Sequence, residues 1–273
     1  MPFIETSDGV RLFYHDWGTG QPVVFVHGWT IGADSWEYQT TFLASHGLRC
    51  IAYDQRGGGR SSQPWDGYGY DTLADDLAAL LDQLDLYEAT LVGHSMGCGE
   101  IARYLSRYGS SRVSKTVLIS TTTPHLVKTT DNPDGIEITL FYETLTRLIA
   151  DRPKYLADIA PGFFGQGLPG CAVSPEMAQW GINLALQASL KASIDLFRTN
   201  AEGDLRADMG AFTVPTLIIH GDADTTATIE LTARKTASAI ANSRLAVYEG
   251  APHGLFLTHT ERLNSDLLGF IQE

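Results

Sequence analysis

The 273-residue chain has few basic side chains, few cysteines and no long apolar run. It contains 19 Lys and Arg against 32 Asp and Glu, which gives a formal net charge of −13, and its basic residues form no cluster. Nucleic acids and anionic membrane surfaces attract clustered Lys and Arg, so we expect neither as a partner. No apolar stretch approaches the roughly 20 residues of a membrane-spanning helix, so no membrane insertion is expected.

The three cysteines, Cys50, Cys98 and Cys171, are an odd and widely spaced set. They form neither a CxxC pair nor the Cys/His spacing of a metal site, so we expect reduced thiols and no bound metal. The N-terminal sequence MPFIETSDGVRL lacks the basic start and the apolar stretch of a secretory signal peptide. These features together predict a cytoplasmic protein.

Short β-branched runs alternate with longer helical patterns along much of the chain. Runs such as PVVFV at Pro22–Val26 are apolar throughout, as is typical of strands that are covered on both faces. This alternation predicts βαβ units and a mostly parallel sheet. We expect strands at 10–17, 22–26, 48–53, 90–92, 113–119, 216–219 and 245–248, and helices at 71–86, 96–108, 228–240 and 259–271.

The alternation breaks after Ser120. Residues 121–206 contain helical patterns and Pro/Gly turns but no good buried strand, and strand patterns resume near Val214. We therefore expect residues 1–120 and 207–273 to form a core domain, and residues 121–206 to form a helical cap inserted into it. The helical patterns of the cap lie at 138–150, 153–159 and 175–196.

A serine with glycine two positions to either side stands between an expected strand and an expected helix. Ser95 lies in Gly93–Gly97, with the sequence GHSMG, which is the G-x-S-x-G pattern of a nucleophile elbow. On so sharp a turn, side chains at the two glycine positions would clash. The turn places the hydroxyl at a helix N-terminus, where backbone N–H groups face developing negative charge. We therefore expect Ser95 to be a nucleophile, and Gly99 to let its helix pack close to the sheet.

A serine nucleophile needs a general base and an acid that orients the base. His253 is the expected base, because it lies in the loop sequence EGAPHG after the last strand pattern, whereas His259 begins a helical pattern and is expected at the surface. The acid is expected after the 216–219 strand, in HGDAD, where two aspartates compete. Asp224 lies further into the loop and is favoured, while Asp222 is expected to bond N–H groups of the turn.

The remaining groups near the expected nucleophile have other roles. His94 is expected to pack against the turn or shape the pocket, and His220, at the end of a strand, is expected to be structural. An oxyanion hole usually pairs the N–H that follows the nucleophile with one from the loop after an earlier strand. These N–H groups belong to Met96 and to Trp29, which lies in HGWT directly after the PVVFV strand.

Six segments of the sequence resemble the α/β-hydrolases, and specifically the bacterial aryl esterases and cofactor-free haloperoxidases, or perhydrolases. These segments are FVHGW, IAYDQRGGGRSSQPWDGYGYDTLADDL, LVGHSMG, DRPKYLADIAPGFFG, PTLIIHGDAD and APHG, and they span nearly the whole chain. The resemblance implies an α/β-hydrolase fold, with a mostly parallel central sheet flanked by helices and a helical cap after the sixth strand. It also implies a triad of Ser95, Asp224 and His253, oxyanion N–H groups from Trp29 and Met96, and no cofactor.

The chain departs from the family pattern at two places. Perhydrolase-type members resemble one another in a proline after the HGW tryptophan, where this chain has Thr30, and the usual apolar-apolar-Pro after the triad aspartate is replaced by TTAT at Thr225–Thr228. We therefore expect a smaller and more polar pocket wall there. The candidate substrate-binding residues are Thr30, Phe164 and Thr226. The cap aromatics either line an apolar pocket or pack the cap core, and they are Phe141, Phe163, Phe164 and Trp180.

The sequence therefore predicts a serine hydrolase that cleaves small carboxylic esters through an acyl-enzyme intermediate. Hydrolysis of lactones or amides, and peracid formation with haloperoxidase-like side activity, are alternatives that use the same triad. An alternative of another class is a hydrolase-fold protein that binds a small ligand with little turnover. The natural substrate and self-association into a homo-oligomer remain open.

Overall fold

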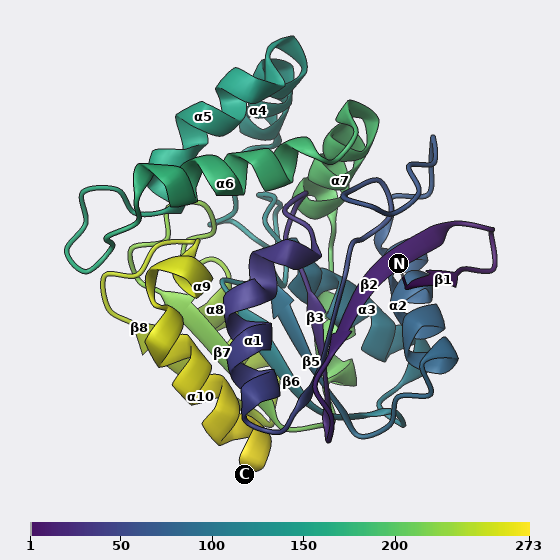
Figure 1. Ribbon diagram of the computed structural model, residues 1–273. Helices are drawn as coiled ribbons and strands as arrows, with labels where there is room; N and C mark the ends of the chain where they lie inside the picture. The colour runs from purple at the N-terminus through teal and green to yellow at the C-terminus, as the bar shows by residue number, and fades with distance from the viewer. Residues whose placement is uncertain (1) are drawn as a thin grey trace.

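The computed structural model describes residues 2–273, and these residues contain one eight-stranded sheet (Figure 1). The strand order is β1-β2-β4-β3-β5-β6-β7-β8. Strand β2 is antiparallel to both of its neighbours, and all strands from β4 to β8 in this order run parallel. The strands are β1 (Phe3–Glu5), β2 (Arg11–Trp17), β3 (Pro22–Val26), β4 (Arg49–Tyr53), β5 (Ala89–His94), β6 (Val113–Ile119), β7 (Thr216–Gly221) and β8 (Ser243–Tyr248).

Helices cover both faces of the sheet. On one face α1 and α10 pack against each other, and on the other face α2 and α3 form a pair whose apolar cluster extends to α8 (Figure 1). Because both faces are covered, the central strands β3 and β5 are buried along nearly their whole length. These helices are α1 (Glu37–Ser45), α2 (Tyr70–Gln83), α3 (Met96–Tyr108), α8 (Ala233–Ala239), α9 (Leu255–Thr258) and α10 (Thr260–Gln272).

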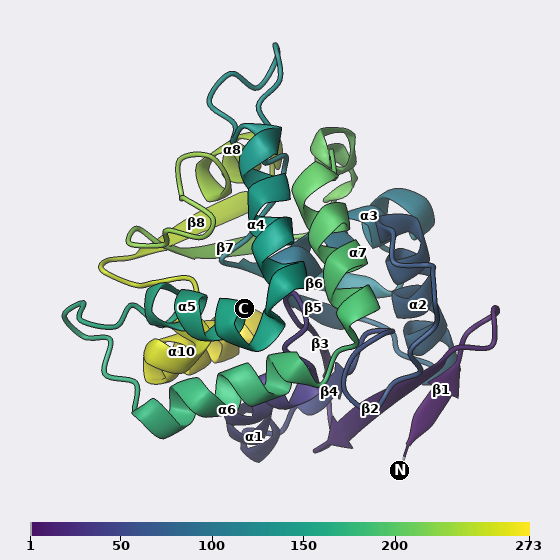
Figure 2. The same ribbon diagram turned by 90° about the horizontal axis from the view of Figure 1, so that it is seen from above.

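Four further helices follow β6 in the sequence and lie together over one edge of the sheet (Figures 1 and 2). They are α4 (Ile138–Ala150), α5 (Arg152–Phe163), α6 (Pro175–Leu186) and α7 (Leu190–Glu202). They contribute a separate apolar cluster, which includes Leu148 and Leu156. The expected mostly parallel sheet with a helical insertion after the sixth strand is confirmed. The exact cap boundaries, 121 and 206, stay a prediction.

Most expected elements are present, but three details of the expectation are wrong. The helix expected at 228–240 is confined to Ala233–Ala239, and β1 and α1 were not expected. The single helical pattern at 175–196 is two helices, because Ser189 begins a new one: its hydroxyl accepts a hydrogen bond from the Ala192 N–H at 3.0 Å. This is a serine N-cap, which satisfies a free N–H of the first helical turn.

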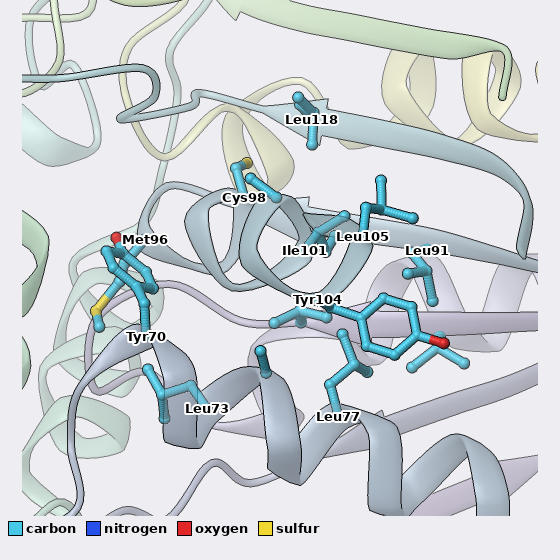
Figure 3. Packing of buried hydrophobic residues seen from close by; sticks show 14 of the residues in the cluster. Tyr70, Leu73, Leu77, Leu91, Met96, Cys98, Ile101, Tyr104, Leu105 and Leu118 are labelled. Carbon is cyan, nitrogen blue, oxygen red and sulfur yellow. The ribbon is translucent and has the colours of Figure 1, made fainter. Parts of the chain in front are cut away.

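Helix α3 lies beside α2 on the same face of the sheet (Figure 3). Its apolar side chains, such as Ile101, pack with Leu73 and Leu77 of α2 in one buried cluster. A Cβ atom on Gly99 would lie 2.5 Å from the hydroxyl oxygen of Tyr70 and 2.6 Å from Cζ of its ring. The expectation that Gly99 lets α3 approach the sheet is therefore wrong, because the close neighbour belongs to α2.

Glu100, the next residue of α3, is fully buried. Its carboxyl group accepts hydrogen bonds from the Tyr53 hydroxyl and from Gln55 Nε2, the latter at 2.6 Å. Burial disfavours the charged form and raises the pKa of Glu100 to about 8. The folded chain therefore retains a proton on Glu100 at a pH where an exposed glutamate has lost it.

Gly99→Ala is expected to lower the free energy of unfolding by about 1–3 kcal/mol, because the new methyl group would overlap the buried Tyr70 ring. Gly269→Ala in α10 is the matched control. Nothing lies within 4 Å of a Cβ there, so the helix should gain about 0.5–1 kcal/mol. Urea unfolding of both variants measures the difference, and equal effects would contradict the Tyr70 contact.

Glu100 is also expected to make the native protein less stable as the pH rises. The contribution of Glu100 to the free energy of unfolding is fully present below its ordinary pKa of 4.5 and is lost as the pH rises through about 8. Between these values the folded state holds a proton on Glu100 that the unfolded state has released. Glu100→Gln does not titrate, so its stability relative to the native protein should rise by roughly 1.4 kcal/mol per pH unit across this interval. Urea unfolding at several pH values measures the change, and a constant difference would refute it.

Candidate active site

Ser95 occupies a sharp turn between β5 and α3. Its backbone has φ 53° and ψ −119°, a region that non-glycine residues rarely adopt. A Cβ on Gly97 would lie 2.4 Å from the Val26 carbonyl oxygen, and one on Gly93 would lie 2.8 Å from Ile101 Cδ1. The expectation that these glycines remove clashing side chains is confirmed.

Three polar side chains meet at the carboxyl edge of the sheet. Ser95 Oγ lies 2.9 Å from His253 Nε2, and His253 Nδ1 lies 2.6 Å from Asp224 Oδ2. Ser95 follows β5, Asp224 follows β7, and His253 lies in the loop after β8. All three are at least 94% buried, since their exposed fractions are 6%, 3% and 2%. In a water-poor site of this kind, hydrogen bonds between polar groups are strong.

Asp224 is held by backbone groups of its own loop. Its Oδ1 accepts from the N–H groups of Thr226 and Ala227, both at 2.8 Å. His220 Nε2 bonds the Ala227 carbonyl at 2.7 Å and lies 3.3 Å from Asp224 Oδ2. Burial by itself would raise the pKa of Asp224, but the positive charge of protonated His253 and the hydrogen bonds from His220 and His253 outweigh it and lower the pKa below its ordinary value. An ionised Asp224 accepts the Nδ1–H of His253, which leaves the Nε2 lone pair facing Ser95.

Asp222 and His259 lie elsewhere. Asp222 is exposed, and its Oδ1 accepts from the Gly250 N–H at 2.6 Å, so it bonds a turn N–H as expected. His259 stands at the start of α10, with Nδ1 2.8 Å from the Thr258 hydroxyl. Neither side chain takes part in the cluster of Ser95, Asp224 and His253.

Two contacts hold the loop that carries His253. His94 Nε2 lies 3.0 Å from the His253 carbonyl oxygen, and burial lowers the pKa of His94 to about 3, so the ring is neutral and donates its Nε2–H. From the cap, the Phe163 carbonyl oxygen accepts from the Gly254 N–H at 2.8 Å, and its ring lies against His253, with centroids 5.5 Å apart. The structural role expected for His94 is thus to support the His253 loop.

The loop after β3 runs directly against the nucleophile turn. A Cβ on Gly28 would lie 2.6 Å from His94 Nδ1 and 3.2 Å from Ser95 Cβ. For the backbone N–H groups of Trp29 and Met96, the structure records no hydrogen-bond acceptor among residues 2–273. Both are therefore free to bind a substrate oxygen, and their role as oxyanion donors stays a prediction.

His27 orients the peptide group that carries the Trp29 N–H. Its Nε2 accepts from the Gln55 N–H at 3.0 Å, so its Nδ1 carries the proton and donates to the Gly28 carbonyl oxygen at 2.7 Å. That carbonyl and the Trp29 N–H belong to one planar peptide, so fixing one fixes the other. Our sequence reasoning missed His27, although its position directly before the glycine of HGW was a signal.

An apolar pocket of about 80 Å³ lies between the cap and the loop after β3 that carries Trp29 and Thr30. Two of the candidate residues, Thr30 and Phe164, line it, whereas Thr226 is exposed and Thr225–Thr228 do not contribute to its wall. The polar wall expected there is therefore wrong for this pocket. Phe163 and Trp180 line it as well, while Phe141 packs against Phe197 in the cap. The other lining residues include Trp29, Ile31, Leu156, Ile159, Ala160, Ile182 and Phe256.

No group of three or more His, Cys, Asp or Glu side chains within residues 2–273 is placed to hold a metal ion. No helix in that part of the chain is both long and apolar enough to cross a membrane.

Comparison with known proteins places the chain in a family. Residues 21–260 match the family model of the alpha/beta hydrolase fold. A non-heme chloroperoxidase of Kitasatospora aureofaciens is 40% identical over 275 residues, and a bifunctional esterase/perhydrolase of Acinetobacter calcoaceticus is 39% identical over 276 residues; each match covers 100% of both chains. A crystal structure of a bromoperoxidase from Bacillus anthracis has a TM-score of 0.95 at 41% identity and covers 100% of this chain and 99% of that one. With its sheet, its inserted helices and its serine turn, the chain belongs to the α/β-hydrolase family.

Proposed function

We propose that the protein is a serine hydrolase that cleaves small carboxylic esters through an acyl-enzyme intermediate. The observation that carries the proposal is the unbroken hydrogen-bond path from Asp224 through His253 to Ser95, next to an apolar pocket. A relative that matches over the full length, and whose name includes esterase activity, supports the same reaction.

In the first half-reaction, Ser95 Oγ attacks the ester carbonyl carbon while His253 Nε2 takes the hydroxyl proton. The carbonyl oxygen becomes an oxyanion, and the N–H groups of Trp29 and Met96 stabilise it. When the intermediate collapses, His253 returns the proton to the alcohol oxygen and the alcohol leaves. Ser95 then carries the acyl group.

In the second half-reaction, water attacks the acyl carbon and His253 removes its proton. The second tetrahedral intermediate collapses, His253 protonates Ser95 Oγ, and a carboxylic acid leaves. Asp224 remains ionised throughout. It keeps the His253 ring in the required tautomer and stabilises its charged form.

Trp29, one of the proposed oxyanion donors, lines the apolar pocket, so we assign the acyl group to this pocket. A volume of about 80 Å³ is well below the ~300–1,000 Å³ of pockets for drug-sized ligands. Its walls are mostly apolar side chains, such as Leu156, Ile159 and Phe256. We therefore expect esters with short acyl chains to be the best substrates.

A second reaction uses the same acyl-enzyme. If hydrogen peroxide attacks in place of water, the acyl group leaves as a peracid and Ser95 regains its proton. The peracid can then oxidise a halide ion to hypohalite and become a carboxylate. The names of two full-length relatives, a chloroperoxidase and an esterase/perhydrolase, favour this as the second candidate.

Ser95→Ala is expected to reduce kcat for p-nitrophenyl esters by at least about 10⁴-fold, because it removes the attacking oxygen. The assay uses acetate, butyrate and octanoate esters with the native protein and the variant. The native rate should fall as the acyl chain lengthens. Acetate, peroxide and bromide together test for halogenation that also depends on Ser95. Equal rates for both proteins would overturn the proposal, and a single burst without turnover would favour a binding protein.

Asp224→Asn is expected to lower kcat by about 10⁴-fold with little change in KM, because an asparagine side chain favours the wrong His253 tautomer. Asp222→Asn is the matched control in the same loop. Its Oδ1 can still accept from the Gly250 N–H, so activity should remain close to native. Comparable losses in the two variants would show that Asp224 acts only through the stability of the loop.

A further inference from the structure

Thr30 has a strained backbone and an unpaired hydroxyl. Its φ is 63°, in the left-handed region that β-branched residues avoid, and only 2% of its surface is exposed. Its Oγ1 has no hydrogen-bond partner among residues 2–273. Strain that persists beside a reaction centre commonly has a functional cause.

Two other polar groups of this pocket wall provide a contrast. The Ser35 hydroxyl donates to the Gly32 carbonyl oxygen at 2.7 Å, and Trp29 Nε1 donates to the Ser193 carbonyl oxygen at 2.9 Å. These two groups have hydrogen-bond partners within the protein, whereas the Thr30 hydroxyl has none among residues 2–273. A buried polar group without a partner is destabilising, so a ligand atom that pairs with it gains affinity.

The position of Thr30 restricts which atom of a substrate it can reach. Thr30 directly follows Trp29, whose N–H is proposed to bind the ester carbonyl oxygen, and consecutive Cα atoms are about 3.8 Å apart. A threonine side chain extends only to its γ atoms. Its partner must therefore lie close to the ester carbonyl. We assign this partner to the first carbon of the acyl chain, which is bonded directly to the carbonyl carbon.

We propose that Thr30 is a specificity-determining residue that selects acyl groups with an oxygen atom on the carbon next to the ester carbonyl. The Thr30 hydroxyl donates a hydrogen bond to this ether or hydroxyl oxygen. The rest of the acyl chain contacts apolar side chains such as Leu156 and Phe164. The substrate class is thus 2-alkoxy and 2-hydroxy carboxylic esters, and the inference rests on the proposed esterase function.

The test compares p-nitrophenyl methoxyacetate with p-nitrophenyl butyrate, two esters of the same length in which an oxygen replaces one methylene. The native protein is compared with Thr30→Val, which keeps the branched shape and removes the hydroxyl. The quantity measured is kcat/KM for methoxyacetate divided by kcat/KM for butyrate. Dividing the native value by the variant value cancels the intrinsic reactivity of the two esters. A loss of about tenfold in this preference is expected.

Two further arms locate the contact. Thr30→Ser keeps a hydroxyl and should retain most of the native preference. The pair 3-methoxypropionate and pentanoate moves the oxygen one carbon further along the chain, and its ratio should not depend on Thr30. If Thr30→Val does not fold, Thr30→Ala provides the same comparison.

The outcomes separate the two proposals. If the native protein hydrolyses neither ester, the esterase function fails and this inference fails with it. If hydrolysis depends on Ser95 but the preference is the same in the native protein and Thr30→Val, only the role of Thr30 is overturned. Thr30→Val should also unfold at the same temperature as the native protein or a higher one, because a buried unpaired hydroxyl becomes a methyl group. An unchanged preference with a lower unfolding temperature would assign the hydroxyl to a structural water instead.

Discussion

Two segments approach each other so closely at the site that neither Gly97 nor Gly28 has room for a side chain. A Cβ on Gly97 would meet the Val26 carbonyl oxygen at 2.4 Å, and one on Gly28 would meet His94 Nδ1 at 2.6 Å. The turn after β5 thus packs directly on the backbone at the end of β3, and the loop after β3 packs directly on the His94 ring. The nucleophile and both proposed oxyanion donors lie on these two segments, so their relative placement depends on this contact before any ligand arrives. Preorganisation of this kind is the main source of transition-state stabilisation in many enzymes.

A chain of buried hydrogen bonds also connects the loop after β3, which carries Trp29, to α3, which follows Ser95. Gln55 Nε2 donates to Glu100 at 2.6 Å and also lies 3.3 Å from the His27 carbonyl oxygen, while the Gln55 N–H bonds the His27 ring. Such a network in a low-dielectric interior is rigid when its members are paired. It holds His27 and Gly28, which precede Trp29 and the strained Thr30 in the loop.

The sequence was most informative at positions where a single physical requirement determines the residue type. Apolar strands such as Pro22–Val26 and the glycines around Ser95 predicted the sheet and its sharp turn, and the order of Ser95, Asp224 and His253 in the chain matches the strand ends that meet in space. Contacts between distant segments were not predictable, because periodicity describes only which face of an element is buried. Two contacts belong to this group: the Tyr70 ring against Gly99, and the hydrogen bond from the Gly254 N–H to the Phe163 carbonyl oxygen.

The bond between the Gly254 N–H and the Phe163 carbonyl oxygen joins the end of α5 to the loop of the proposed base. If this end of the cap moved away, the loop would lose an anchor and the His253 ring would lose a neighbour. Movement of the C-terminal end of α5 away from the core would therefore remove the support that holds His253 next to Ser95. The position of the proposed base thus depends on the cap as well as on the core, because this hydrogen bond and the Phe163 ring both come from α5.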